Sequence, residues 1–307
     1  MAAAVAQALR RFLDRLRDVE SEDSDTQSGL SREFNAIKME SAALSERPES
    51  ACEAGKTRDN IKKNRYKDIV AFDRTRVPLT LLSDEGYTDY INANFISGVG
   101  DRDYIATQGP LPHTVVDFWR MIWEYKVQVI VMSCREVEMA KRKCERYWAQ
   151  PDTDTTFGPF IIHSVSEENP NSEFTIRNLS VTLRNESRAV RQLHYTAWPD
   201  HGIPDTFDCL LDMIGLVNKL QPPPPHPAPP VCVHCSAGCG RTGVICTVDY
   251  IQTLLQRKMI SADFSICDIV KNIRQQRPSA VQTKDQYRFV YQVVAHMFQK
   301  VLDGFNQ

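Results

Sequence analysis

The sequence has no surplus of charge of either sign. Its 307 residues include 37 lysines and arginines and 39 aspartates and glutamates, which gives a formal net charge of -2 at pH 7. Proteins that bind nucleic acid or anionic membrane surfaces by long-range attraction carry a clear excess of positive charge. We therefore expect no nucleic-acid partner, and any site for an anion must be built locally from a few residues.

Long hydrophobic runs and a secretory leader are also missing. The most apolar stretch, residues 127–134, is much too short to cross a bilayer. The first residues form an amphipathic pattern that arginines interrupt at positions 10 and 11, unlike a signal peptide. Nine cysteines without such a leader indicate free thiols in a reducing compartment. We expect a soluble monomer of the cytoplasm, with the nucleus as an alternative location, and no membrane span.

Composition places most of the chain among ordinary globular proteins, because 42% of the residues are hydrophobic and 25% are charged. Residues 1–59 contain two helical patterns, near 4–19 and 31–44, and form an appended helical segment. Beyond them, short β-branched runs alternate with amphipathic helical patterns, which predicts an α/β or α+β protein. The runs that predict strands are residues 77–82, 104–107, 127–133, 175–183 and 231–234.

One low-complexity element, residues 221–230, is rich in proline and directly precedes the last predicted strand. Its composition predicts a polyproline II segment. A stiff surface spacer is the simpler interpretation, and a ligand for an SH3 or WW domain is the alternative.

The most informative segment is a strand, a glycine-bearing loop and a helix in succession. We call residues 235–241 of this segment the cysteine loop. Such a loop can turn its backbone N–H groups inward, and the helix adds the positive end of its dipole to the same cavity. Gly238, Gly240 and Gly243 allow a close backbone approach, and Arg241 can offer a planar fork to two oxygens of a tetrahedral dianion. The same field favours a thiolate at Cys235, so the pattern predicts a nucleophile facing a bound phosphate.

Two neighbours of Cys235 have predicted supporting roles. Thr242 can donate a hydrogen bond to the sulfur, and His234 can fix the loop through hydrogen bonds to the backbone. Taken singly, Cys235 could equally be an inert buried thiol, and Arg241 could belong to a surface ion pair.

A metal site is a rival interpretation of the same residues, because Cys232 and Cys235 have the spacing of half a zinc site. His234 and Cys239 would complete it. No second pair with ligand spacing follows, and Arg241 would place a cation beside the metal. We therefore expect no metal and no cofactor.

A series of motifs resembles those of the protein tyrosine phosphatases, in family order. The match covers about residues 60–300 and is most similar to the PEST-type non-receptor subgroup. It implies the Cys-x5-Arg phosphatase fold, a twisted sheet that is mixed or mostly parallel and flanked by helices, with a catalytic domain at 60–305 after the extension at 1–59. The motifs are residues 64–68, 89–95, 107–110, 118–124, 143–148, 198–200, 234–243 and 282–287.

The resemblance implies hydrolysis of phosphotyrosine in two steps. Cys235 would attack phosphorus to form a phosphocysteine, while Arg241 and the N–H groups of the loop hold the oxygens. Asp200 would protonate the departing tyrosine and then act as base for a water that Gln282 positions. The loop residues that would contact the phosphate are Ser236, Ala237, Gly238, Cys239 and Gly240.

For Asp200 and Gln286, the neighbouring residues also support an interpretation that does not depend on the resemblance. Asp200 follows Trp198 and Pro199 in a segment suited to moving as a stiff flap, although a solvated loop aspartate is the alternative. Gln286 would help Gln282 to position the water, but Thr283-x-x-Gln286 is also a capping box at the start of the last helix.

Four further residues are implied to contact the substrate or the loop. Tyr66 at the mouth of the cleft would make the pocket deep enough for phosphotyrosine and too deep for phosphoserine, the alternative being a half-buried core aromatic. Asp68 resembles the residue that accepts hydrogen bonds from the substrate backbone. Glu138 would pair with Arg241 and Lys143 would approach the flap, while solvated surface charges are the alternative for both.

The leading hypothesis is an active phosphatase whose partners are phosphotyrosine-containing proteins. A catalytically inactive phosphotyrosine-binding module is one alternative, and a dual-specificity or phosphoinositide phosphatase is the other. Tyr66 and the lack of lysine in the cysteine loop count against the latter. Because the chain stops just after its last helix, we expect the subgroup's PEST-rich tail and the partners it recruits to be absent, unless the protein is a short natural form.

Overall fold

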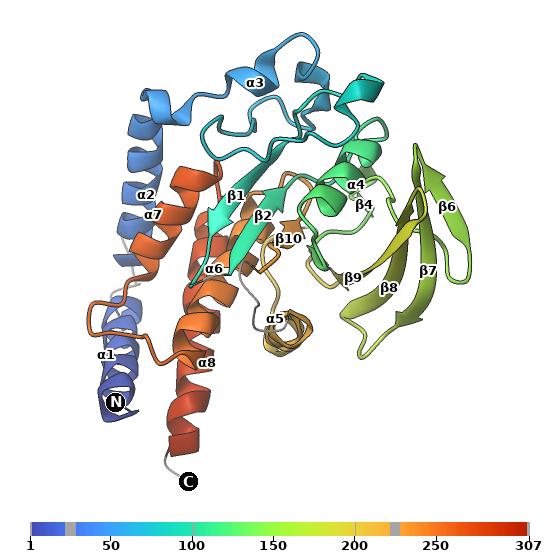
Figure 1. Cartoon of the computed structure of the whole chain (residues 1–307). Coiled ribbons are helices and arrows are strands. Elements are labelled where there is room, and N and C mark those ends of the chain that lie inside the picture. The colour runs from blue at the N-terminus through green and yellow to red at the C-terminus, as the bar shows by residue number, and fades with distance from the viewer. Residues whose placement is uncertain (1, 22–28, 101, 200, 222–227, 306–307) are drawn as a thin grey trace.

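The computed structural model describes residues 2–21, 29–100, 102–199, 201–221 and 228–305. A mixed eight-stranded sheet runs through this part of the chain, with helices on both faces (Figure 1). The four inner strands are parallel neighbours and the outer pairs are antiparallel. In spatial order the strands are β1 (Ala93–Ser97), β2 (Asp103–Thr107), β10 (Val231–His234), β3 (Val129–Met132), β9 (Glu186–Tyr195), β8 (Phe174–Leu183), β7 (Phe160–Glu168) and β6 (Asp154–Phe157).

The burial of each strand follows its place in the sheet. All four residues of β10 and all four of β3 are buried, as expected for parallel strands covered on both faces. In β7 the buried and exposed residues alternate over Phe160–Val165, because one face of the outer sheet meets solvent. The predicted mixed sheet flanked by helices is confirmed, and its parallel pairs are confined to β2, β10, β3 and β9.

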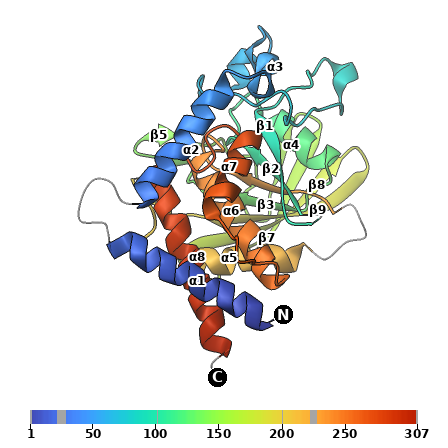
Figure 2. The same ribbon diagram turned by 90° about the vertical axis from the view of Figure 1, so that its left-hand side faces the viewer.

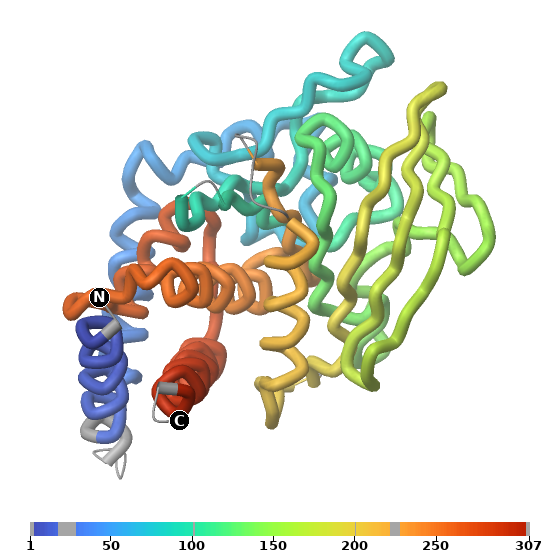
Figure 3. Tube along the Cα trace, turned by 60° about the horizontal axis from the view of Figure 1, so that its bottom comes forward, coloured from blue at the N-terminus to red at the C-terminus, as the bar shows by residue number. Residues whose placement is uncertain are grey.

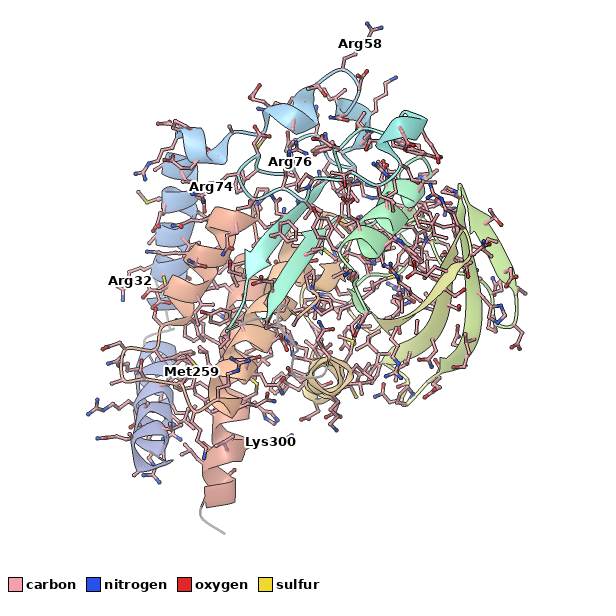
Figure 4. The ribbon with its side chains drawn as sticks, viewed as in Figure 1. Arg32, Arg58, Arg74, Arg76, Met259 and Lys300 are labelled. Carbon is pink, nitrogen blue, oxygen red and sulfur yellow. The ribbon has the colours of Figure 1, made fainter. Side chains whose placement is uncertain are left out.

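The sheet separates two hydrophobic cores, which the side chains in Figure 4 fill on either side of it. Val231 and Val233 of β10 face the core formed by the C-terminal helices. Cys232 between them faces the core formed by α4, around Phe118 and Trp119. The helices are α1 (Ala2–Ser21), α2 (Gly29–Ser45), α3 (Glu53–Lys56), α4 (Val115–Glu124), α5 (Asp208–Leu220), α6 (Gly240–Gln256), α7 (Ile266–Gln276) and α8 (Lys284–Phe305), with short 3-10 turns η1 (Pro48–Ser50), η2 (Ile61–Lys63) and η3 (Ser83–Glu85).

The two N-terminal helices pack on the C-terminal ones. Figure 2 shows α1 crossing α8 and α2 lying along α7, and Figure 3 shows α1 beside the end of α8, far from β6 and β7. Leu9, Phe34 and Ile37 are buried in the same core as α6, α7 and α8. Glu33 accepts hydrogen bonds from Tyr287 and Tyr291, both at 2.7 Å. The helices predicted near 4–19 and 31–44 are thus confirmed, while the domain boundary at residue 60 stays a prediction.

The predicted strand at residues 77–82 is wrong. Val77 and Leu79 are buried and donate single hydrogen bonds to the carbonyls of Ala93 and Asp89, at 3.1 and 2.9 Å. Pro78 between them has no N–H to continue a ladder, and Leu82 has φ 64°. The apolar alternation therefore reflects a buried irregular segment beside β1.

Two further predictions concern membrane-spanning helices and the proline-rich segment. None of the helices that the structure describes is long and apolar enough to span a membrane. The predicted polyproline segment falls mainly on residues 222–227, which lie outside the described residues. At its borders, the side chain of Gln221 donates a hydrogen bond to the carbonyl of Pro229.

Candidate active site

Cys235 lies at the end of β10, where the chain turns into α6. Its side chain is only 5% exposed. Its Sγ accepts a hydrogen bond from the N–H of Gly238 at 3.2 Å and another from the hydroxyl of Thr242 at 3.3 Å. Two donors aimed at one sulfur stabilise a thiolate, and the N-terminus of α6 adds the positive end of its dipole.

A cleft of about 420 Å³ opens above this sulfur and brings together most of the residues predicted for the site. Ile69 and Met139 also line it and were not predicted. Thr242, His234, Gly238 and Cys239 lie beneath its floor and are buried. Asp200 lies outside the described residues. The predicted residues that line the cleft are Tyr66, Asp68, Glu138, Lys143, Cys235, Ser236, Ala237, Gly240, Arg241, Gln282 and Gln286.

Arg277 is fully buried and binds the backbone of the cysteine loop. Its guanidinium donates to the carbonyls of Gly238 and Ala237 and to the side chain of Asn94, each at 2.9 Å. Two successive carbonyls of the loop are therefore occupied by Arg277, while the N–H of Gly238 is directed to the sulfur of Cys235. Arg277 was not among the predicted site residues, because its only local signal is an arginine before a proline at the end of a helical pattern.

Gly238 is required at its position in the loop. Its φ is +72°, and a Cβ there would lie 2.2 Å from the carbonyl oxygen of Thr107. An L-residue would therefore suffer both backbone strain and a clash with β2.

Arg241 is fixed by a buried carboxylate. Its two terminal nitrogens donate to the oxygens of Glu138 at 2.7 and 3.1 Å, and the Glu138 side chain is only 5% exposed. Burial is the largest single influence and opposes the positive charge of Arg241, but hydrogen bonding and charge attraction to Glu138, together with smaller contributions from nearby thiols, outweigh it, so the pKa of Arg241 is raised. The guanidinium is thus permanently charged and oriented at the edge of the cleft.

The same guanidinium reaches the predicted flap. Arg241 Nη2 donates to the carbonyl of Pro199 at 3.3 Å and the group lies over the ring of Trp198, 5.5 Å from its centroid. Trp198 is buried, and its indole N–H donates to the carbonyl of Gly202 at 3.2 Å. The residues on both sides of Asp200 are therefore tied to the site.

Tyr66 forms one wall of the cleft. Its hydroxyl lies 2.8 Å from Oγ of Ser236, and Ser236 donates to the carbonyl of Lys143 at 3.0 Å. The Tyr66 hydroxyl is therefore the donor in this chain of hydrogen bonds. The ring is half-buried and lines the cleft, so it can form a wall that deepens the pocket.

Gln286 makes both hydrogen bonds of the capping box, which was the alternative interpretation of this residue. Its backbone N–H donates to Oγ1 of Thr283 at 3.2 Å, and its side-chain oxygen accepts from the N–H of Thr283 at 3.2 Å. The same oxygen also accepts from the N–H of Gln282 at 2.8 Å. Gln286 thus fixes the backbone of Gln282, whose own side chain is exposed in the cleft.

His234 supports the loop from within the core. Its Nε2 lies 2.7 Å from the hydroxyl of Tyr147, which itself accepts from the amide of Gln192 at 2.8 Å. The carbonyl of Cys235 can only accept, so Nδ1 carries the proton and donates to it at 3.1 Å, and Nε2 of the neutral ring accepts from the Tyr147 hydroxyl. Burial lowers the pKa of His234 to about 3.

His194 is a second buried neutral histidine. Its Nδ1 accepts from Arg177 at 2.9 Å, so its Nε2–H donates to the carbonyl of Cys134 at 2.7 Å. Burial and the charge of Arg177 lower the pKa of His194 to about 4.

Stability is therefore expected to fall in mild acid. Below pH 6.5 the unfolded chain protonates both histidines and the folded chain does not. Each histidine therefore lowers the free energy of unfolding, by on the order of 2 kcal/mol at pH 5. Above pH 6.5 both are neutral in either state, and they change the free energy of unfolding no further. Urea unfolding should show that the free energy of unfolding falls less between pH 7 and pH 5 for His194→Gln than for the wild type. His163→Gln, where the side chain is 45% exposed, serves as the control. An equal fall in the free energy of unfolding in all three proteins would contradict the assignment.

A metal centre finds no support in the part of the chain that the structure describes. No group of three or more histidine, cysteine, aspartate or glutamate side chains there is arranged to hold a metal ion. The nine cysteines are all free thiols.

Comparison with known proteins identifies the family. Residues 60–296 match the family described as protein-tyrosine phosphatase. The chain is 50% identical to tyrosine-protein phosphatase non-receptor type 18 of Mus musculus over 295 residues, which are 96% of this chain and 64% of the relative. The chain thus spans slightly less than two thirds of that relative's length.

Solved structures agree with this match. The catalytic domain of human protein tyrosine phosphatase non-receptor type 18 superposes with a TM-score of 0.85 at 51% identity, covering 88% of this chain and 96% of that one. A structure of PTPN18 in complex with HER2 phosphopeptides gives a TM-score of 0.88 at 49% identity, covering 95% and 99%. This chain belongs to the protein-tyrosine phosphatase family.

Proposed function

We propose that the protein hydrolyses phosphotyrosine in other proteins by two successive displacements at phosphorus. The observation that carries this proposal is the buried sulfur of Cys235, which accepts two hydrogen bonds at the base of a cleft whose edge holds Arg241. A thiolate held beside an oriented guanidinium is a nucleophile facing a binding site for a dianion.

In the first displacement, Cys235 Sγ forms a bond to phosphorus as the bond from phosphorus to the tyrosine oxygen breaks. Asp200 gives its proton to the departing phenolate, so that neutral tyrosine leaves. Arg241 and the inward N–H groups of the cysteine loop hold the three equatorial oxygens, where charge develops. These donors are already in place, because Glu138 and Arg277 orient them before substrate arrives.

In the second displacement, a water molecule attacks the phosphocysteine. Asp200, now ionised, takes a proton from the water as the bond between sulfur and phosphorus breaks, and phosphate leaves with the thiolate restored. Gln282 positions the water. Its side chain lies in the cleft, and its backbone N–H is held by Gln286.

The depth of the cleft selects the substrate. Tyr66 stands at its wall, fixed through Ser236, so a phosphoryl group on a short serine side chain would not reach Cys235. Asp68 would accept hydrogen bonds from the substrate backbone, and Lys143 would approach the flap. The relative solved with HER2 phosphopeptides supports phosphotyrosine-containing proteins as partners. A cytoplasmic location and an SH3 or WW partner at residues 221–230 stay predictions.

Turnover by the purified wild-type protein tests the proposal. We expect hydrolysis of phosphotyrosine peptides in the presence of reductant and chelator, and a kcat/KM for matched phosphoserine peptides that is lower by orders of magnitude. Binding without turnover would show the inactive module instead. Comparable rates on phosphoserine or phosphoinositide substrates would show a dual-specificity or lipid phosphatase, and loss of activity with chelator would show a metal enzyme.

A further inference from the structure

The backbone just before Gln282 is strained. Ser279 has φ 58° and Val281 has φ 54°, both in the left-handed region. A β-branched residue is a clear outlier there and persists only where its surroundings hold it. Because Val281 immediately precedes Gln282, whatever holds this segment also sets the direction in which Gln282 leaves it.

Arg274 of α7 holds the strained segment. The side chain is buried, and it donates through Nε to the carbonyl of Ala280 and through Nη2 to the carbonyl of Val281, both at 2.8 Å. From the opposite side, the N–H of Val281 donates to the carbonyl of Cys239 at 3.3 Å. A planar fork on two successive carbonyls fixes the orientation of both peptide groups.

The cysteine loop and this segment are in direct contact. A Cβ on Gly243 would lie 2.3 Å from the backbone nitrogen of Val281, so the start of α6 and the strained segment approach as closely as backbones can. A shift of Val281 would therefore move Gln282 relative to the sulfur of Cys235.

Helix α2 in turn holds Arg274. Its Ser41 accepts a hydrogen bond from Nη1 at 3.2 Å, and the guanidinium lies over the ring of Phe34, 5.5 Å from its centroid. Figure 2 shows α2 running along α7, and in Figure 4 Arg32 points outward from α2 while Phe34 is buried. Helix α2 lies outside the residues 60–296 that match the family.

We propose that Arg274 is a positioning residue for the second displacement and that α2 keeps it in place. The inference rests on the proposed function. The first displacement uses Asp200 together with Cys235 and Arg241, and the hydrogen bonds of Arg274 go to Ala280, Val281 and Ser41 instead of to either of the latter two. Attack of water on the phosphocysteine depends on Gln282, so loss of the Arg274 fork slows that step and spares the first.

Rapid mixing of Arg274→Met with p-nitrophenyl phosphate tests this. We expect a burst of p-nitrophenol that approaches one equivalent per enzyme at a rate within about twofold of wild type, followed by a steady state lowered about 10- to 100-fold, the usual effect of a misplaced catalytic group. Rapid denaturation during the steady state should trap more phosphocysteine than in the wild type.

Three further variants complete the experiment. Lys271→Met removes another contact between α7 and α2, the ion pair with Glu40 at 2.9 Å, and should leave the ratio of the two rates unchanged. Phe34→Leu combined with Ser41→Ala should shift the ratio in the same direction as Arg274→Met, by less. Should Arg274→Met fail to fold, Arg274→Lys keeps the charge and loses the fork.

The outcomes separate this inference from the proposed function. Equal slowing of both displacements, or no added phosphocysteine in either Arg274 variant, would overturn the role of Arg274. An unchanged ratio in the Phe34 and Ser41 double variant would overturn the role of α2. A wild-type protein without phosphotyrosine turnover would instead defeat the proposed function itself.

Discussion

Cys235→Ser is expected to abolish turnover of phosphotyrosine while peptide binding survives. A serine hydroxyl is nearly isosteric, so the cleft and the guanidinium of Arg241 remain as they are. The hydroxyl does not ionise near neutral pH, and the two donors at Gly238 and Thr242 then face a neutral oxygen. No phosphoenzyme should form, whichever leaving group the substrate carries.

The measurement combines steady-state kinetics with binding of a fluorescent phosphopeptide. Cys209→Ser, at a half-buried thiol on α5, is the matched control and should keep wild-type kinetics. Residual turnover by Cys235→Ser above about 1% of the wild-type rate would mean that another group attacks phosphorus, since loss of a nucleophile usually costs far more.

Arg241→Lys is expected to lower kcat/KM about 10³- to 10⁴-fold, a loss typical of an arginine that stabilises a transferring phosphoryl group. Lysine carries the charge but cannot bond two phosphate oxygens while keeping both contacts to Glu138, at 2.7 and 3.1 Å. The substitution also removes Nη2, which donates both to Oε2 of the buried Glu138 and to the carbonyl of Pro199.

Arg146→Lys provides the comparison for that result. Arg146 also pairs with a glutamate, Glu136 at 2.8 Å, but its side chain is 41% exposed and does not line the cleft. Its replacement should change kcat/KM less than about twofold, because exposed ion pairs contribute little. A loss below tenfold for Arg241→Lys would mean that the loop N–H groups alone hold the phosphate.

The cysteine loop could be predicted from the sequence because its parts are contiguous. Cys235, Gly238 and Arg241 lie within seven residues, between a short apolar run and a helical pattern, and the chemistry follows from that order. The supports of the loop could not be predicted in this way. Arg277 reaches the loop, and Tyr147 reaches the preceding His234, each from a distant segment. A single arginine or tyrosine has no local pattern that distinguishes a buried anchor from a surface residue.

The sheet was predictable only in part, for a related reason. The runs at 104–107 and 231–234 are apolar because both faces of the inner strands are covered, and they correspond closely to β2 and β10. Strand β9 was missed because Arg188 and Arg191, whose side chains lie on opposite faces of the strand, break up the apolar signal. Its place is fixed by its ladders with β3 and β8, which a local pattern does not contain.

The bond from Arg241 to Pro199 implies a reciprocal coupling between two equilibria. The guanidinium lines the cleft, and its Nη2 also donates to the carbonyl of Pro199, beside the ring of Trp198. By thermodynamic linkage, an anion that binds better when Arg241 has this orientation also favours the contact between Arg241 and the Trp198–Pro199 segment. A change that stabilises this contact in turn raises the affinity for the anion by the same factor. An inhibitor that fills the cleft without touching Arg241 would gain nothing from this linkage.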